Sequence, residues 1–226
     1  MKIYCMSDIH GYLFAFDSAL ALVEERLAEA DTRLVLLGDY IHGPDSYGVL
    51  DRIMALQRKW GRDKVIALRG NHEDMVCDGT WPIGEPRIKS EDGEKEKDGR
   101  YIQWMEDLPF YWLEGNVIFV HAGIDEELED MWEWTDEHTC LWKYPAETGR
   151  FYGDMKIVAG HVATAQIAGD PGFHGIYFDG EAHYYIDGTV QESGEIPVLL
   201  ADTDANRFYR ITESGAWTVL PYNEYE

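Results

Sequence analysis

The stretch LLGDYIHGPDS, residues 36–46, decides the fold of this chain. Its apolar start is typical of a buried strand, and the Gly-Asp that follows places the carboxylate of Asp39 at the point where the strand ends. Gly-Pro-Asp-Ser has the composition of a turn, and apolar residues recur at helical spacing beyond it. The stretch therefore predicts a strand, a turn, and a helix that begins near Asp45 or Ser46 and ends at Gly61.

The same arrangement of apolar run and polar turn recurs along the first two thirds of the chain. Because helical patterns separate these runs, the sequence predicts an α/β fold with a largely parallel central sheet. After residue 174 the chain changes to short aromatic runs divided by turn residues, which predicts antiparallel hairpins that can form a second sheet. The other four apolar runs of the first part are KIYCMSD (2–8), KVIALRGNH (64–72), NVIFVHAG (116–123) and KIVAGH (156–161).

Length and composition predict a single domain over residues 1–226, since no segment has the composition of a linker. Residues 78–100 are rich in charge, Gly and Pro, and they lack both the helical and the strand period. We therefore expect an exposed insertion loop over 78–100, and the sequence leaves open whether it acts as a lid.

The charge balance bounds the partners of this chain. The formal net charge is −24, from 43 acidic against 19 basic residues, which disfavours binding to nucleic acid and to anionic membranes. No apolar run approaches the roughly 20 residues that span a bilayer, and the N-terminus does not resemble a secretory signal. Three dispersed cysteines, Cys5, Cys77 and Cys140, are typical of reduced thiols, so we expect a cytoplasmic protein of undetermined oligomeric state.

Residues able to bind metal follow each of the five apolar runs. Because functional groups gather beyond the carboxyl ends of strands in open α/β sheets, we expect these side chains to converge. Carboxylate, imidazole and carboxamide groups together suit two divalent ions, with manganese the first choice and iron or zinc the alternatives. Two ions about 3.5–4 Å apart favour hydrolysis of a phosphate ester, because they clamp the reacting oxygens and lower the pKa of a bound water. The residues concerned are Asp8, His10, Asp39, Asn71, His72, His121 and His161.

The motifs SDIHG, GDY, LRGNHE, HAG and AGH, in this order and spacing, make the chain resemble the calcineurin-like metallophosphoesterases. More narrowly, it is similar to the phosphoprotein phosphatase branch, which includes bacterial serine/threonine and tyrosine phosphatases and symmetrical diadenosine tetraphosphate hydrolases. The resemblance runs from Met1 to about Asp187. It implies a four-layer α/β/β/α sandwich with two mixed sheets and a dinuclear metal centre between the sheet ends.

The resemblance also implies a role for each matching residue. Asp8 and His10 would hold the first ion, Asp39 would bridge the two ions, and the second ion would be held by the three further ligands Asn71, His121 and His161. His72 matches the general acid that protonates the leaving oxygen. Glu73 resembles a residue that orients the ligands.

The second motif departs from the family pattern, because GDYIHGPDS stands where GDYxDRGPxS is expected. His42 replaces an Asp-Arg pair, of which the Asp partners the catalytic histidine and the Arg binds phosphate. A second phosphate-binding arginine is expected after the LW motif, where this chain has Lys143. We expect His42, Lys143 and Arg69 to be the candidates for substrate binding. His42 either supplies part of the lost positive charge or fills a shortened turn.

These observations predict a dimetal-dependent phosphomonoesterase in which a metal-held hydroxide attacks the phosphorus. Its substrate would be a phosphoprotein or a small phosphate ester. A dinucleoside polyphosphate hydrolase is one alternative, although such a polyanionic substrate requires more cations than the motifs offer. The other alternative is a degenerate, metal-holding binding module with little turnover.

Overall fold

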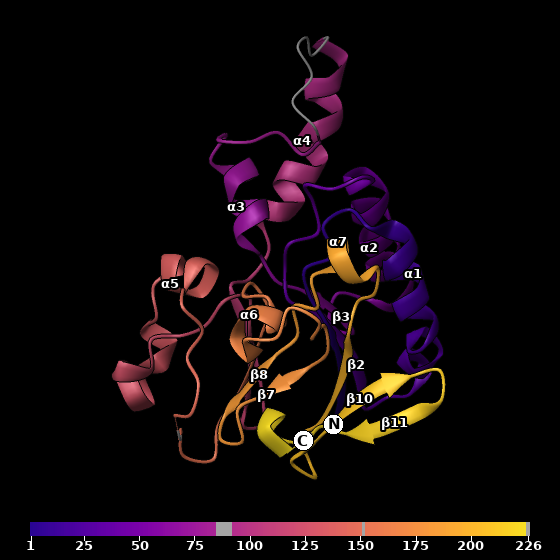
Figure 1. The fold of residues 1–226 in the computed structure, drawn as a ribbon. Coiled ribbons are helices and arrows are strands. Elements are labelled where there is room, and N and C mark those ends of the chain that lie inside the picture. The colour runs from indigo at the N-terminus through magenta and orange to yellow at the C-terminus, as the bar shows by residue number, and fades with distance from the viewer. Residues whose placement is uncertain (85–91, 151, 225–226) are drawn as a thin grey trace.

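The computed structural model describes residues 1–84, 92–150 and 152–224, and its strands form two mixed sheets, as expected for this α/β class (Figure 1). The elements, in chain order, are β1 (Lys2–Met6), α1 (Leu13–Ala21), η1 (Glu24–Ala28), β2 (Thr32–Leu36), α2 (Ser46–Trp60), β3 (Val65–Ala67), α3 (Asn71–Cys77), α4 (Asp92–Glu106), β4 (Tyr111–Glu114), β5 (Val117–Val120), η2 (Glu126–Trp134), α5 (Glu137–Trp142), β6 (Lys156–Ala159), α6 (Thr164–Ala168), β7 (Tyr177–Phe178), β8 (His183–Tyr185), α7 (Val190–Ser193), β9 (Val198–Asp202), β10 (Arg207–Thr212), β11 (Gly215–Thr218) and η3 (Tyr222–Glu224).

The first sheet has the strand order β11-β10-β9-β1-β2-β3. Its strands β1, β2 and β3 are parallel, and Leu36 pairs with Met6 on one side and with Ala67 on the other. The three strands therefore end at the same edge, where the turns that follow them lie side by side. The helix expected after β2 is confirmed, because the Asp45 side chain caps α2 by accepting a hydrogen bond from the Gly48 backbone.

The second sheet has the strand order β4-β5-β6-β8-β7. Here β5, β6 and β8 are parallel, with Phe119 opposite Val158 and Val158 opposite Tyr184. The carboxyl ends of these strands form a second shared edge. The turns that carry His121 and His161 leave from that edge.

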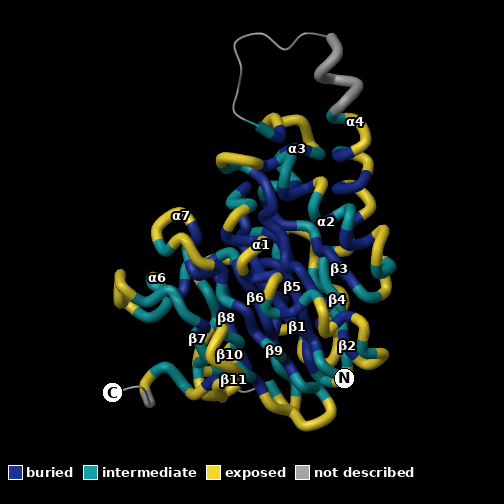
Figure 2. The backbone as a smooth tube through the Cα atoms, turned by 90° about the vertical axis from the view of Figure 1, so that its right-hand side faces the viewer, coloured by how far each residue is buried: buried dark blue, intermediate teal, exposed yellow. Residues whose placement is uncertain are grey.

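The two sheets pack face to face and a helical layer covers each outer face. Cys5 and Phe119 point into the core between the sheets, whereas the next residue of β1, Met6, packs against the helices of the first sheet. Val120 of β5 packs outward, against Trp132 of η2. Figure 2 shows the central strands buried beneath the exposed turns. Alternate residues of each strand thus face different layers, as the period of two requires, and the result is the expected four-layer sandwich.

The ligand-bearing strands do not share the single parallel sheet that the run pattern predicts. Strands β1–β3 belong to the first sheet, whereas β5 and β6 belong to the second. The C-terminal strands are also divided, since β9–β11 extend the first sheet and β7 and β8 complete the second. A strand buried on both faces has the same apolar pattern in either sheet, so the pattern could not assign it to one.

The structure also differs from the loop expected over residues 78–100, because α4 begins at Asp92. Tyr101 and Trp104 anchor the end of this helix in the core, and Trp104 Nε1 donates a hydrogen bond to Gln57 Oε1 at 2.9 Å. The polar residues before Tyr101 have only a weak helical periodicity in the sequence. They join the helix because it propagates from its anchored C-terminal part. Residues 85–91 of the expected loop lie outside the described residues.

The structure also bears on the expectations for the cysteines and for membrane-spanning helices. Cys5, Cys77 and Cys140 are free thiols. Among the described helices, none is both long and apolar enough to cross a bilayer.

Candidate metal centre

The candidate metal ligands meet between the ends of the two sheets. They form two groups whose ligand atoms lie within 4.8 Å of one another, and Asp39 belongs to both. This sharing is the arrangement that a carboxylate bridging two ions requires. The first group consists of His10, Asp39 and His72, and the second consists of Asp39, His121 and His161.

The remaining two candidate ligands, Asp8 and Asn71, lie beside these groups. Asp8 Oδ1 is 3.9 Å from His10 Nε2, so the first two candidates of the chain are neighbours. The side-chain amide of Asn71 lies 2.8 Å from His121 Nε2 and 3.2 Å from His161 Nδ1. All six residues predicted as metal ligands are therefore brought together, with His72 next to them.

The ligands sit in turns with strained backbones. Non-glycine residues rarely adopt a left-handed backbone, and such conformations tend to mark functional sites. This conformation turns the chain sharply after a strand. Four of the six candidates have a positive φ, namely Asp8 at 51°, His10 at 44°, Asp39 at 57° and His161 at 64°.

Two of these turns touch at a pair of glycines. A Cβ on Gly38 would lie 2.6 Å from the Cα of Gly70, and one on Gly70 would lie 2.3 Å from Asp39 Oδ1. Neither contact is possible for a larger residue without moving the backbone. The absence of both side chains lets the turn after β2 approach the start of α3.

Glu73 joins the same two turns by hydrogen bonds. Its buried carboxylate accepts from the backbone N–H groups of Asp39 at 2.8 Å, Tyr40 at 2.8 Å and Gly70 at 3.0 Å. Burial and the nearby charge of Asp39 raise the pKa of Glu73, and the three N–H donors act in the opposite direction. Glu73 thus orients the turn that presents Asp39, which agrees with the orienting role that the resemblance implies.

Backbone carbonyls set the tautomers of two candidate ligands. His10 Nδ1 lies 3.2 Å from the carbonyl of Ile41, and His121 Nδ1 lies 3.0 Å from that of Leu37. A carbonyl can only accept, so each Nδ1 carries the proton and each Nε2 directs its lone pair at the cluster. This is the arrangement of histidines that bind metal through Nε2.

The buried carboxylates also fit a cation. Burial, together with the charges of Asp187 and Asp39, raises the pKa of Asp8 well above its usual range, and burial likewise raises the pKa of Asp187. Burial alone would raise the pKa of Asp39, but three neighbouring imidazoles and the backbone N–H of His72 lower it to about 2. Among the ion pairs of the described residues, none brings Lys or Arg to these carboxylates. Divalent cations would balance this concentration of negative charge.

Asp187 reads as a structural turn residue in the sequence, and it lies in the turn that follows β8. Its Oδ1 accepts from the Thr189 backbone at 2.8 Å, and its charge acts on Asp8.

His72 lies at the edge of the cluster and pairs with His42. Its Nε2 is 3.8 Å from Asp39 Oδ2, and its Nδ1 is 2.7 Å from His42 Nδ1. On the far side of the His42 ring, Nε2 lies 2.9 Å from the carbonyl of Pro82. Burial lowers the pKa of both histidines. Pro82 had no signal in the sequence, since any residue could supply this backbone carbonyl.

The other two substrate-binding candidates are engaged elsewhere. The guanidinium of Arg69 donates to the carbonyls of Met105 and Glu106 near the end of α4. Lys143 Nζ donates to the Ile124 carbonyl at 2.8 Å and lies 3.2 Å from the buried Glu126. Neither cation is directed at the cluster.

The comparison with protein families decides the family. Residues 1–195 match the model of the calcineurin-like phosphoesterases. The chain belongs to this family. Calcineurin-like phosphoesterases act on phosphate esters and generally bind two divalent metal ions, which agrees with the chemistry of the cluster.

The relatives of this phosphoesterase differ in substrate. A symmetrical bis(5'-nucleosyl)-tetraphosphatase of Acidovorax sp. (strain JS42) is 29% identical over 151 residues, which are 63% of this chain and 49% of the relative. The chain thus spans about half the length of the curated relatives it matches. A solved cold-active protein-tyrosine phosphatase of a psychrophilic Shewanella has a TM-score of 0.65 at 17% identity, with 97% of this chain and 80% of that chain covered. A protein serine/threonine phosphatase from Saccharomyces cerevisiae has a TM-score of 0.59 at 17% identity, with 89% and 72% covered.

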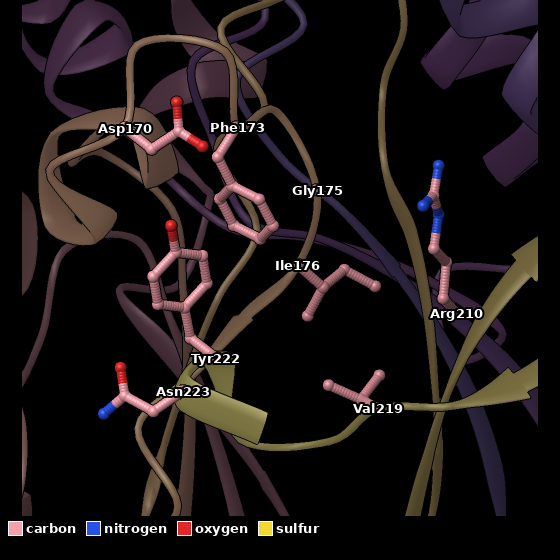
Figure 3. Close-up of a pocket in the computed structure, with 8 residues that line it drawn as sticks. All are labelled: Asp170, Phe173, Gly175, Ile176, Arg210, Val219, Tyr222 and Asn223. Atoms are coloured by element: carbon pink, nitrogen blue, oxygen red, sulfur yellow. The ribbon is translucent and has the colours of Figure 1, made fainter. Parts of the chain in front are cut away.

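One cavity of the phosphoesterase opens beside the candidate acid. It has a volume of about 620 Å³, and both His42 and His72 line it. A cavity of about 630 Å³ elsewhere is bounded by Phe173 and Tyr222 on one side and by Arg210 on the other (Figure 3). Of the described residues that line this other cavity, none belongs to the cluster, whereas His72 lines the cavity beside the candidate acid.

The Glu73 hydrogen bonds generate a stability prediction. Glu73→Ala leaves three buried N–H groups without a partner, so we expect the free energy of unfolding to fall by about 3 kcal/mol. Glu73→Gln keeps one acceptor oxygen and should lower it by about half as much. Urea unfolding in the presence of a chelator measures this free energy without a contribution from bound metal.

The matched control is Asp74→Ala, which removes the partly exposed carboxylate of the next residue, 3.5 Å from Arg69. This change should lower the free energy of unfolding by less than about 1 kcal/mol. An equal effect of Glu73→Ala and Asp74→Ala would show that Glu73 does not hold the two turns together.

Proposed function

We propose that this chain is a dimetal-dependent phosphomonoesterase. The observation that carries the proposal is the shared position of Asp39 in two ligand groups, with His72 beside them. Asp8 and His10 would hold one ion, and Asn71, His121 and His161 would hold the other, with manganese the first choice of metal because the ligands mix oxygen and imidazole nitrogen.

The ions, when bound, supply positive charge to the phosphoryl oxygens and lower the pKa of a water. The chain supplies orientation and the proton. Asp39, held by Glu73 and by the backbone N–H of His72 at 3.0 Å, fixes the geometry between the two ligand groups. His72 protonates the leaving oxygen as the ester P–O bond breaks, and the oxygen of the attacking water forms the new bond to phosphorus.

The hydrogen bonds of His42 favour a positioning role over phosphate binding. Because the carbonyl of Pro82 can only accept, His42 Nε2 carries a proton. In a neutral His42 the Nδ1 then accepts from His72 Nδ1, so the proton that His72 gives to the leaving oxygen is the one on Nε2 of its imidazolium form, and this Nε2 faces Asp39. His42 thereby takes the place of the acid that partners this histidine in the family, and neither Arg69 nor Lys143 replaces the arginine of the missing pair. We propose neither Arg69 nor Lys143 as a phosphate ligand.

A dinucleoside polyphosphate hydrolase remains the second candidate. The name of the 29% identical Acidovorax relative favours it. The charge of the described site disfavours it, because four phosphates would face a site to which neither Arg69 nor Lys143 is directed. The free thiols of the chain support a reducing compartment, and we propose a cytoplasmic location.

The proposal predicts metal-dependent turnover. Protein stripped of metal and reloaded with manganese should hydrolyse p-nitrophenyl phosphate and phosphopeptides faster than diadenosine tetraphosphate. His72→Asn should lower kcat by about 10²–10⁴ with the metal content retained. Asp39→Asn should lower both the activity and the metal content, measured by plasma mass spectrometry.

Asp17→Asn on α1 and His138→Asn on α5 are matched controls, because both residues are exposed and outside the cluster. They should keep wild-type rates. Bound metal without hydrolysis of any of the three substrates would contradict the proposal and favour a degenerate binding module. Faster hydrolysis of diadenosine tetraphosphate would favour the second candidate.

The pairing of the two histidines gives a separate prediction. His42→Ala should lower kcat about ten- to a hundred-fold and leave the metal content unchanged, because His72 loses its orientation but the ligands do not change. The loss should be larger for alkyl phosphates than for p-nitrophenyl phosphate, whose leaving oxygen needs less help from an acid. A uniform loss across leaving groups, or a loss of metal, would contradict the positioning role.

A further inference from the structure

The cavity beside His72 is built from three separate segments around the candidate acid. It lies where the group attached to a leaving oxygen must go, because an acid that protonates this oxygen must lie within hydrogen-bond reach of it. The eight lining residues are Tyr12, His42, Gly43, Pro44, His72, Met75, Trp81 and Gly84.

The wall formed by Trp81 is held in place by its neighbours. The Trp81 backbone N–H donates to the carbonyl of Met75 at 3.0 Å, which folds the chain after α3 back over the helix. Ile83 is buried in the core, and the carbonyl of Pro82 accepts from His42. The Trp81 ring lies 6.4 Å from the His42 ring, edge to face, although half of its surface is exposed. An aromatic surface is thus fixed above the histidine pair.

Among the residues that the structure describes, the lining carries no Asp, Glu, Lys or Arg. Tyr12, Met75 and Trp81 supply aromatic and thioether surface. A leaving nucleoside diphosphate would bring several negative charges, which require cations or forked donors. A seryl or threonyl group offers this lining no aromatic face. A flat, uncharged ring suits the surface, since it stacks on aromatic side chains and contacts sulfur favourably.

We propose that this cavity binds the aromatic leaving group of an aryl phosphate monoester, with Trp81 and Met75 as its walls. The assignment rests on the proposed phosphomonoesterase function. Hydrolysis breaks the bond between phosphorus and the aryl oxygen, and the electron pair stays on that oxygen. The proton comes from His72, water supplies the new oxygen on phosphorus, and the products are a phenol and inorganic phosphate.

Trp81→Ala tests the cavity by binding, independently of turnover. Calorimetry on the manganese-loaded protein compares phenylphosphonate with methylphosphonate, two non-hydrolysable probes that differ only in the ring. Wild-type protein should prefer phenylphosphonate, and Trp81→Ala should reduce this preference about three- to ten-fold, as expected for the loss of one aromatic contact.

The matched control is Trp217→Ala, which removes a tryptophan of similar exposure on β11, at the opposite end of the molecule from α3 (Figure 1). This control should keep the wild-type preference. A preference that is absent, or that Trp81→Ala does not reduce, overturns the assignment. So does adenosine monophosphate displacing phenylphosphonate in a manner that depends on Trp81, because the occupant would then be a nucleobase.

Kinetics separate the failure of this assignment from the failure of the proposed function. The ratio of kcat/KM for phenyl phosphate over that for an alkyl phosphate should fall in Trp81→Ala by the same factor as the binding preference. Hydrolysis of both esters with an unaltered ratio overturns the cavity assignment and leaves the phosphomonoesterase intact. Binding that depends on Trp81, without hydrolysis of either ester, supports the cavity and contradicts the phosphomonoesterase.

Discussion

The candidate metal centre depends on the contact between the turn after β2 and the start of α3. Glu73 joins these two segments through three backbone N–H groups, and Gly38 and Gly70 let them touch. Asp39 lies between them with a left-handed backbone, which costs free energy of order 1–3 kcal/mol unless the surroundings hold it. One buried carboxylate therefore orients another, and the shared ligand of the two groups is fixed before any ion binds.

The sequence predicted that the candidate ligands converge, because their position follows from strand geometry. A residue directly after a buried parallel strand must lie at the sheet edge, so Asp8, Asp39, Asn71, His121 and His161 could be placed without knowing the fold. The division into two sheets could not be seen, since β1 and β5 have the same apolar pattern in either sheet. The helix α4 was missed because Tyr101 and Trp104 anchor it by tertiary contacts, and local propensity carries no record of them.

At His42 the motif shows which residues are missing, but it does not show which groups the histidine contacts. The missing Asp-Arg pair was visible from a one-residue deletion, but the partners of His42 were not. Its contacts are the ring of His72, 30 residues along the chain, and a backbone carbonyl 40 residues along. Only the fold brings these groups together. The same fold turns Arg69 and Lys143 toward other acceptors, so the cations nearest in sequence do not compensate for the lost arginines.

The described residues thus combine a cluster of candidate metal ligands with a neighbouring cavity that has an aromatic lining. The central claim is that Asp39 joins two ions. Anomalous diffraction from crystals grown with manganese, recorded on both sides of its absorption edge, tests it most directly. The account predicts two peaks about 3.5–4 Å apart, one on each side of the Asp39 carboxylate. A single peak, or two peaks of which one lies away from Asp39, would contradict it.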